Sequence, residues 1–463
     1  MTRPAPHACR AARRIQAARR DEEGGALVLG ILWTAILLLI GGLAIDTTNA
    51  WRNRAMLQVT VDAATHAGVM KLPQPGRAIT NAQKSEIIAE AVRMAKLHMS
   101  PSVYGEVVTP DTVQVGRWNP ADGTIDTTSL YPDTIQVTAK RTSDLGNPVA
   151  WMIMDMIGAA QSWDVGATSM VQRFLPDCMT DGIVSAEYSE LTSGNEIVAP
   201  FCLHGETGVS MSNSNSFEEG TIVSMPDFSM LELPQAGYES NPGLLEALAQ
   251  EHLYPRLTAD IPMLFEALQD IRSPYQPGYI LNGYGHEIDV NQSDFNPAAL
   301  SPGNVYRVRC GNGTLPLAES PSNKTLKLES DAVLFKNVIV TNCAVMISAG
   351  AFIGDSVVIT SNTGSQSIGG NSGAEVGAPD SCTAGGRAAL MTKGDVVFPS
   401  TAKFNDAQIV ALGSVHIAAA PGGITGIQVE ALGPVKLTAS GGFALCPNRD
   451  YPDFQGNHYR FVK

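Results

Sequence analysis

The sequence predicts one membrane-spanning helix that continues as a rod, then an α+β region, then a β-rich C-terminal region. Three observations support this order. Residues 24–45 form an apolar run without a charge, residues 46–72 contain no proline and keep a helical spacing, and the last third alternates short apolar runs with Gly, Asn or Asp turns. The predicted segments are a basic tail at 1–23, the helix at 24–72, an α+β domain at 73–175, a mixed low-complexity and helical region at 176–300 and a β-rich domain at 301–463.

The apolar run at 24–45 is long enough to cross a bilayer, because a helix rises about 1.5 Å per residue and the hydrocarbon core is roughly 30 Å thick. Six arginines precede it, with no acid until Asp21, so the positive-inside rule keeps the N-terminus in the cytoplasm and sends the rest of the chain across. The alternative is a cleaved secretory signal, but the run exceeds the usual apolar region of about 7 to 15 residues. A single-pass anchor is the favoured interpretation.

Beyond the span, residues 51–72 carry a stripe of small or flexible apolar side chains at helical spacing. Its members lie three or four residues apart: Met56, Val59, Ala63, Ala67 and Met70. We call this set the stripe. Two interpretations stay open: the stripe contacts helices of other membrane proteins, or it packs on the protein's own second helix and sheet.

Several motifs together resemble a known family. The Arg-rich lead is followed by E-x-G-G at residues 22–25, G-L-A-I-D ending at Asp46, and R-x-x-L-Q-x-x-x-D-A-A at residues 54–64. VQVGRWNP at 113–120 and IQVTAKR at 135–141 continue the similarity. The sequence resembles the TadE/TadG-like group of tight-adherence (Flp) pilus assembly proteins over about residues 21–175.

The resemblance implies a pilin-like rod in the bacterial inner membrane, with a periplasmic C-terminal region and a structural or assembly role in the pilus system. The implied partners are the lipid bilayer and other pilus-assembly membrane proteins, through helix–helix contacts. Many TadG-like relatives also carry a von Willebrand A domain with a D-x-S-x-S metal motif, which this sequence lacks. The alternative function is a membrane-anchored surface protein whose β-rich domain binds carbohydrate or mediates adhesion.

The charge excludes nucleic acid as a partner. The net charge is −14, and the first twenty residues contribute +6, so the remainder carries −20. A phosphate backbone requires a basic surface, which an acidic chain does not offer.

The cysteines predict structural disulfides in an oxidising compartment. Cys9 lies before the span, and an even number follow it without a CxxC spacing: Cys178, Cys202, Cys310, Cys343, Cys382 and Cys446. We expect three disulfides, with Cys178–Cys202 as the first pair because these two are closest in sequence. The remaining connectivity is open.

No catalytic, cofactor-binding or metal-ligating residue is predicted, and the protein is not expected to be an enzyme. His204, His252 and His286 are scattered singly, without the spacing of a helical metal site. The aspartates of the C-terminal third stand at turn positions, where Asp commonly turns the chain, and no GxSxG motif is present.

In the middle of the chain, the sequence predicts short helices and strands. In the α+β region these are a helix at 81–98 capped near Thr80, strands at 105–108, 112–118, 133–141 and 164–171, and a short helix at 149–157. Further on, helices are expected at 242–254 and from about 260, with Pro262 in the first turn of the second. Residues 202–223 are either an exposed loop or the first coils of a β-solenoid.

The β-rich domain predicts a β-solenoid, with a β-sandwich as the alternative. Strands are expected at 325–328, 333–335, 338–341, 344–347, 356–359, 395–397, 407–412, 415–418, 426–431 and 435–438. No strict repeat length survives. The Ser/Gly-rich segment at 361–386 is expected to form a long surface loop.

Overall fold

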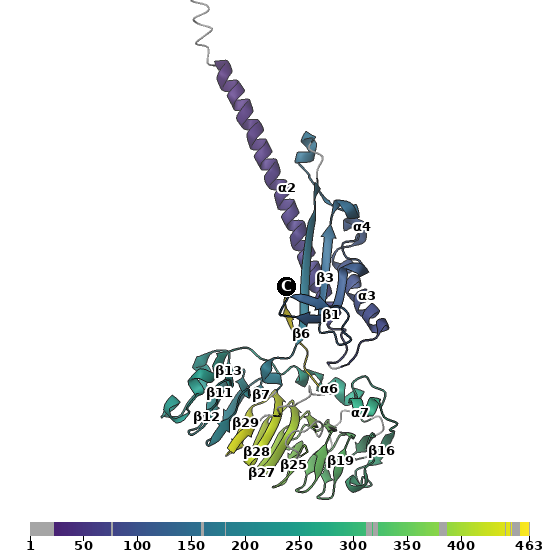
Figure 1. The fold of residues 1–463 in the computed structure, drawn as a ribbon, viewed down its shortest axis with the longest axis vertical. Coiled ribbons are helices and arrows are strands. Elements are labelled where there is room, and N and C mark those ends of the chain that lie inside the picture. The colour runs from purple at the N-terminus through teal and green to yellow at the C-terminus, as the bar shows by residue number, and fades with distance from the viewer. Residues whose placement is uncertain are drawn as a thin grey trace, which may run out of the picture. The chain divides into compact units, whose positions relative to one another are not determined.

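The chain folds into two compact units (Figure 1). The computed structural model describes residues 23–75, 77–158, 162–180, 182–311, 317, 323–378, 387–439, 441–444, 446 and 454–462. The first unit, here called the helix–sheet unit, contains residues 1–73, 77–172 and 460–463. The second, here called the parallel-strand unit, contains residues 74–76 and 173–459.

Helix α2 (Glu23–Val69) is a single helix of 47 residues and forms the rod of the helix–sheet unit (Figure 1). It joins the apolar run and the following amphipathic segment without interruption, because neither contains a proline. This confirms the long N-terminal apolar helix that the sequence predicts.

Helix α3 (Asn81–His98) packs on the C-terminal half of α2 and is capped as predicted. The Thr80 hydroxyl accepts from the Gln83 amide at 3.2 Å, and the Gln83 side chain accepts from the Thr80 amide at 2.9 Å. A Cβ added to Gly68 of α2 would lie 3.1 Å from the Ile135 side chain, which is tighter than ordinary contact, and 3.6 Å from the Cβ of Ala91 in α3. Helix α4 (Pro101–Tyr104) follows.

The sheet of this unit has five strands in the order β2-β1-β3-β6-β31. The first three neighbouring pairs are antiparallel, so the topology is that of the predicted α+β unit. The strands are β1 (Val113–Asn119), β2 (Thr124–Asp126), β3 (Thr134–Arg141), β6 (Val165–Phe174) and β31 (His458–Phe461).

Two predictions for this region are wrong. Residues 105–108 form no strand, since Gly105 takes a φ of 72° and Pro110 then starts a turn of 3-10 helix. Residues 149–157 form no α-helix: β4 (Val149–Ala150) pairs with β5 (Ser162–Trp163), and only Met154–Ile157 coil, as a 3-10 helix. The carboxylate of Asp46 binds three amides of that segment, which holds it out of an α-helix.

The parallel-strand unit is a parallel sheet that curls, and its strand pairs fall into three series. The first runs in spatial order through β16 (Glu287–Asn291), β17 (Val305–Arg309), β20 (Val338–Thr341), β23 (Ser356–Thr360), β26 (Ala388–Thr392), β27 (Val396–Ala411), β28 (Val415–Ala431), β7 (Gly182–Ser185), β10 (Cys202–Gly205), β13 (Ile222–Met225) and β15 (Leu248–Gln250).

The other two series also run through the long strands β27 and β28, which therefore belong to all three. The second runs through β18 (Thr325–Leu328), β21 (Ala344–Ile347), β24 (Ile368–Gly370), β27, β28, β29 (Val435–Ala439), β8 (Tyr188–Leu191), β11 (Gly208–Met211) and β14 (Leu231–Glu232). In the third, β19 (Val333–Phe335) pairs with β22 (Phe352–Gly354), and β25 (Glu375–Val376), β27, β28, β30 (Gly441–Ala444), β9 (Asn195–Ile197) and β12 (Ser216–Phe217) continue it.

The β-rich C-terminal region is therefore confirmed, and its described strand pairs are parallel, unlike those of the antiparallel β-sandwich alternative. Strands from 176–300 and 301–463 belong to one sheet, because residues 428–431 pair with 182–185. Residues 202–223 are strands and not an exposed loop, since Cys202 pairs with Gly182 and with Ile222, each twenty positions away.

A few helices accompany this sheet. Helix α6 (Leu257–Ala267), with Pro262 inside it, covers the first series and packs Ile261, Leu264 and Phe265 against it. The other short helices of this unit are α5 (Leu244–Ala247) and α7 (Gly278–Leu281), and its 3-10 turns are Asp177–Met179, Phe228–Met230, Gly237–Ser240 and Pro297–Ala299. The 3-10 turns of the helix–sheet unit are Pro110–Thr112, Ser143–Leu145 and Met154–Ile157.

Two further predictions for this unit are wrong in part. A helix over 242–254 does not form beyond α5, because Leu248 pairs with Val223 and draws the following residues into β15. Residues 361–386 are not simply a surface loop, since Ile368, Ala374 and Val376 are fully buried and β24 and β25 join the sheet. Residues 379–386 of that segment lie outside the described part.

Disulfides tie the parallel-strand unit, and the predicted pair Cys178–Cys202 is confirmed. Cys310–Cys343 forms a second bridge, and Cys446 is also disulfide-bonded. Cys9 and Cys382 lie outside the described residues. Closing loops of 24 and 33 residues contributes about 2 to 4 kcal/mol for each bridge in the chain-entropy account.

Candidate functional site

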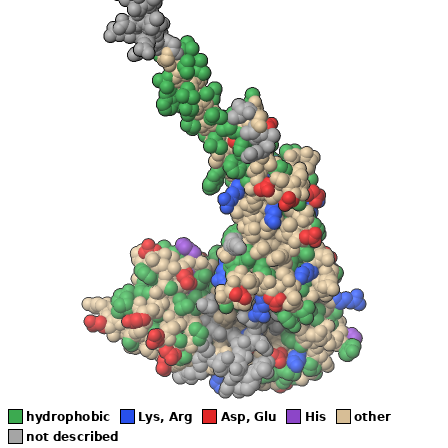
Figure 2. All heavy atoms as spheres, turned by 45° about the horizontal axis from the view of Figure 1, so that its top comes forward, with side chains coloured by type: hydrophobic (Ala, Val, Ile, Leu, Met, Phe, Trp, Pro, Cys, Tyr) green, Lys and Arg blue, Asp and Glu red, His purple; other side chains and the backbone are tan. Residues whose placement is uncertain are grey.

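The N-terminal half of α2 presents an almost entirely apolar surface (Figure 2). Its large side chains are exposed: Leu27, Val28, Leu29, Ile31, Leu32, Trp33, Leu37, Leu38, Leu39, Ile40, Leu43 and Ile45. Within the described residues, α2 is the one helix long and apolar enough to cross a membrane. A surface of this kind requires lipid or another protein around it.

The second half of α2 has one buried and one open face. Leu57, Val61 and Ala64 are fully buried against α3 and the sheet. The predicted stripe adjoins this buried face, and two of its members, Val59 and Met70, are 59% and 61% exposed.

The other three stripe residues, Met56, Ala63 and Ala67, are half-buried. Of the two interpretations of the stripe, the internal one does not hold for Val59 and Met70, while the other three members are partly covered within the helix–sheet unit. The helix–sheet unit fills its core with the adjoining face of α2, and the exposed part of the stripe is formed by Val59 and Met70.

Asp46 ends the apolar run and is buried, with 1% of its surface exposed. One carboxylate oxygen accepts from the amides of Met152 at 2.8 Å and Ile153 at 3.1 Å, and the other accepts from Met154 at 2.9 Å. Three N–H groups converge on this carboxylate, and such charge-assisted bonds are about twice as strong as neutral ones. The contact ties the loop after β4 to α2.

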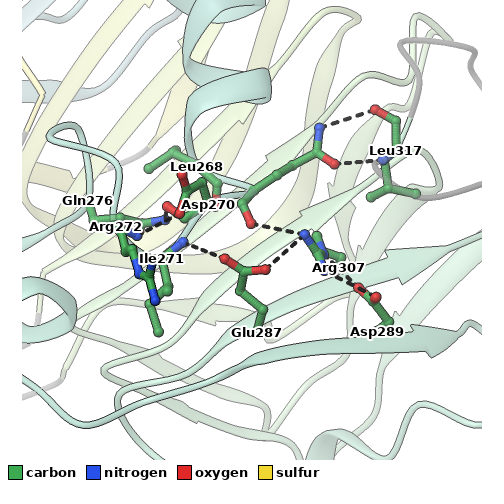
Figure 3. Close-up of polar contacts among 10 residues, drawn as sticks. Leu268, Asp270, Ile271, Arg272, Gln276, Glu287, Asp289, Arg307 and Leu317 are labelled. Carbon is green, nitrogen blue, oxygen red and sulfur yellow. Dashed lines mark hydrogen bonds and ion pairs between the residues drawn. The ribbon is translucent and has the colours of Figure 1, made fainter.

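A polar pocket of about 820 Å³ lies beside β16 and β17 in the parallel-strand unit. Figure 3 shows Arg307 between two carboxylates: it bonds Asp289 at 2.6 and 3.1 Å and approaches Glu287 to 3.1 Å. The hydrogen bonds and charge of Asp289 raise the pKa of Arg307. Because the cation is compensated within the pocket, this cluster fits a structural role on the sheet.

The structure brings together residues that looked scattered in the sequence. His204 contacts the Ser224 hydroxyl at 2.8 Å and Glu206 at 3.1 Å, and Glu206 binds His252 at 2.6 Å. His204 and Ser224 are paired residues on the neighbouring parallel strands β10 and β13. Their separation of twenty positions was the signal that the sequence offered for this contact. The positions of His204 and His252 in the sequence do not reveal that both contact Glu206.

This cluster does not have the access that catalysis needs. His204 and Ser224 are fully buried, so the Ser224 oxygen cannot meet a substrate. Burial lowers the pKa of His204, with the bonds to Glu206 opposing that effect. Among the described residues, no group of three or more His, Cys, Asp or Glu side chains is arranged to hold a metal ion.

One buried carboxyl in the parallel-strand unit makes folding depend on pH. Glu430 is 1% exposed, and its oxygens accept from the Leu257 amide and the Gln428 side chain, each at 3.2 Å. Burial raises the pKa of Glu430 from 4.5 to about 7. The folded state therefore keeps a proton that the unfolded chain releases.

We expect the stability contributed by protonated Glu430 to be fully present below pH 4.5 and to be lost as the pH rises through 7. Relative to Glu430→Gln, which cannot ionise, the free energy of unfolding of the unaltered protein should fall by about 3 kcal/mol over that interval. Denaturant titrations followed by circular dichroism at pH 4 and pH 8 measure it. A difference that does not change with pH would contradict the assignment.

The apolar helix and the folded unit that continues from it fit a single-pass membrane protein. Comparison with known families agrees: the family described as putative Flp pilus-assembly TadE/G-like matches residues 24–71. A second family, described as a domain of unknown function (DUF7867), matches residues 182–447. This match covers more than half of the chain, and the chain belongs to that family.

Other comparisons add little. No curated protein matches the chain. Among solved structures, the crystal structure of an ice binding protein from an Antarctic Biological Consortium is 14% identical and covers 59% of this chain and 91% of its own, with a TM-score of 0.21. That TM-score supports no argument about fold or function.

Proposed function

We propose that this protein is a membrane-anchored structural or assembly component of a Flp/tight-adherence pilus system. The observation that carries the proposal is the TadE/G-like match over residues 24–71, which covers both the apolar half of α2 and the stripe. The protein acts by packing, and we propose no enzymatic activity for it.

The stripe is the proposed contact with helices of other pilus-assembly membrane proteins. Ala63 and Ala67 are small, which lets a second helix approach closely, and Met56 and Met70 adapt to its surface. Helices anchored in the same bilayer are already oriented relative to one another. Their contact therefore costs little additional conformational entropy.

For the parallel-strand unit we infer a three-sided β-solenoid. The three series of parallel pairs and the local steps of twenty residues support it. An experimentally determined structure of the intact protein tests the inference: residues 428–431 should lie beside 182–185, and two separately closed sheets would contradict it.

The proposed topology places the N-terminus in the cytoplasm and everything beyond the span in the periplasm of a bacterial inner membrane. Alkaline phosphatase fused after Gly146, which lies in the helix–sheet unit, should be active because it would be exported. The same enzyme fused after Arg20 should be inactive. An inactive fusion at Gly146, with a cytoplasmic reporter active there, would overturn the orientation.

Co-purification tests the functional proposal. After crosslinking in native membranes, the full-length protein should recover other pilus-assembly membrane proteins. Recovery of none of them, together with binding of the protein to cell-surface glycans, would instead favour the alternative of a surface protein that binds carbohydrate.

A further inference from the structure

We propose that residues 151–158, here called the interfacial loop, are seated in the headgroup–acyl boundary of the membrane and form a second lipid contact beside α2. The proposal rests on the proposed membrane span of α2. It adds a specific surface and a specific occupant, phospholipid, to the helix–sheet unit.

The level of the loop along α2 carries the argument. A Cβ added to Gly42 would lie 2.7 Å from the Ile153 side chain, so Ile153 packs directly against the apolar run. Gly42 precedes Ile45, the end of that run, by three residues, or roughly 5 Å at 1.5 Å per residue. Interfacial segments bury their apolar face to about 5 to 10 Å, so Ile153 lies at the matching depth.

The side chains of the interfacial loop suit this boundary. Met156 and Met152 are 82% and 59% exposed, although both are apolar. Trp151 stacks on Trp163 of β5, with ring centroids 5.8 Å apart.

Backbone amides of the interfacial loop are hydrogen-bonded, which suits a poorly hydrated site, where an unpaired amide is energetically costly. Asp46 accepts from the amides of Met152, Ile153 and Met154. The amide of Met156 donates to the Ile153 carbonyl at 3.1 Å, and that of Gly158 to the Asp155 carbonyl at 3.0 Å. The loop can therefore present apolar side chains without exposing these N–H groups.

Lipid is the occupant that the geometry favours over a partner helix. The interfacial loop lies against the same apolar run whose remaining side chains are exposed to the bilayer, so its outer side continues a lipid-facing surface. Asp155, which is exposed, limits the depth, because a carboxylate in hydrocarbon is costly. The loop thus stays at the level of the lipid headgroups, and the side chains of Met152 and Met156 extend toward the acyl chains.

Fluorescence quenching in vesicles tests the proposal on the full-length protein. In a Cys9→Ser background, single cysteines replace Met156, Leu38 in the apolar run, or Leu130, and each carries an environment-sensitive dye. Leu130 is 59% exposed, and its carbonyl binds the amide of Ile79, beyond the distal end of α2. The vesicles contain phosphatidylethanolamine and phosphatidylglycerol, with bromine on the acyl chains or iodide in the water as quencher.

We expect the dye at Met156 to be quenched by shallow bromines and to be several-fold less accessible to iodide than the dye at Leu130. If Met156 is as accessible to iodide as Leu130 while Leu38 is quenched by bromine, the loop proposal fails and the span stands. If Leu38 is also accessible to iodide, the span itself fails. Shielding of Met156 from both quenchers would show a protein contact and contradict the lipid assignment.

Discussion

Replacing Val59 with Glu is expected to abolish pilus assembly while leaving the amount and protease resistance of the protein unchanged. Val59 is the centre of the open face of α2, so in the free protein the new carboxylate remains in water. Exposed substitutions of this kind usually change stability by no more than about 0.5 kcal/mol. In a contact with a helix of another protein, the same carboxylate would be desolvated without a compensating cation or hydrogen bond, at a cost of a few kcal/mol.

The matched control is Ala64→Glu, five positions further along the same helix. Ala64 is fully buried in the core of the helix–sheet unit, so this variant should lose stability by several kcal/mol and be degraded. Assembly and protein level are followed by immunoblotting and by electron microscopy of pili. Normal assembly with Val59→Glu would exclude the open face as a partner surface, and degradation of that variant would assign it to the core.

Asp46→Ala is expected to release the loop after β4 from α2. The substitution leaves the amides of Met152, Ile153 and Met154 without their acceptor. Each unsatisfied buried donor costs about 1 to 3 kcal/mol, so cleavage within 151–158 should increase markedly. Asp46→Asn should have an intermediate effect, because its oxygen can keep the bonds to Met152 and Ile153 but its NH₂ group cannot accept from Met154.

Limited proteolysis with mass-spectrometric mapping measures the release, and Asp62→Ala provides the control. Asp62 lies on the same helix, half-buried, and accepts a 2.9 Å bond from the Gln58 side chain, so its loss should have little effect. Equal cleavage in Asp46→Ala and Asp62→Ala would mean that the Asp46 carboxylate does not hold the loop.

Local signals predicted the C-terminal strands well, because each apolar run is bounded by turn residues. The segments at 325–328, 333–335, 338–341 and 344–347 have the predicted limits. Pairing could not be predicted, since residues 428–431 bind 182–185 across most of the unit. The false helix at 149–157 has a similar cause: its acceptor, Asp46, lies more than 100 residues earlier.

The open face of α2 shows the same limit. Spacing identified the stripe, but Leu57, Val61, Ala64 and Gly68 follow an equally regular spacing on the adjoining face. Both faces carry small or apolar residues, so sequence alone does not tell which one fills the core. The packing of α3 and β3 decides it, because Gly68 lies against Ile135 of β3 and Ala91 of α3.

The most direct test of the partner surface is photo-crosslinking in membranes of cells that assemble the pilus. A photoreactive amino acid at Val59, on the open face, is compared with one at Leu97, which is 67% exposed near the end of α3. An adduct with another pilus-assembly membrane protein is expected from Val59 and not from Leu97. No adduct from Val59, or the same adducts from both positions, would contradict a partner surface on α2.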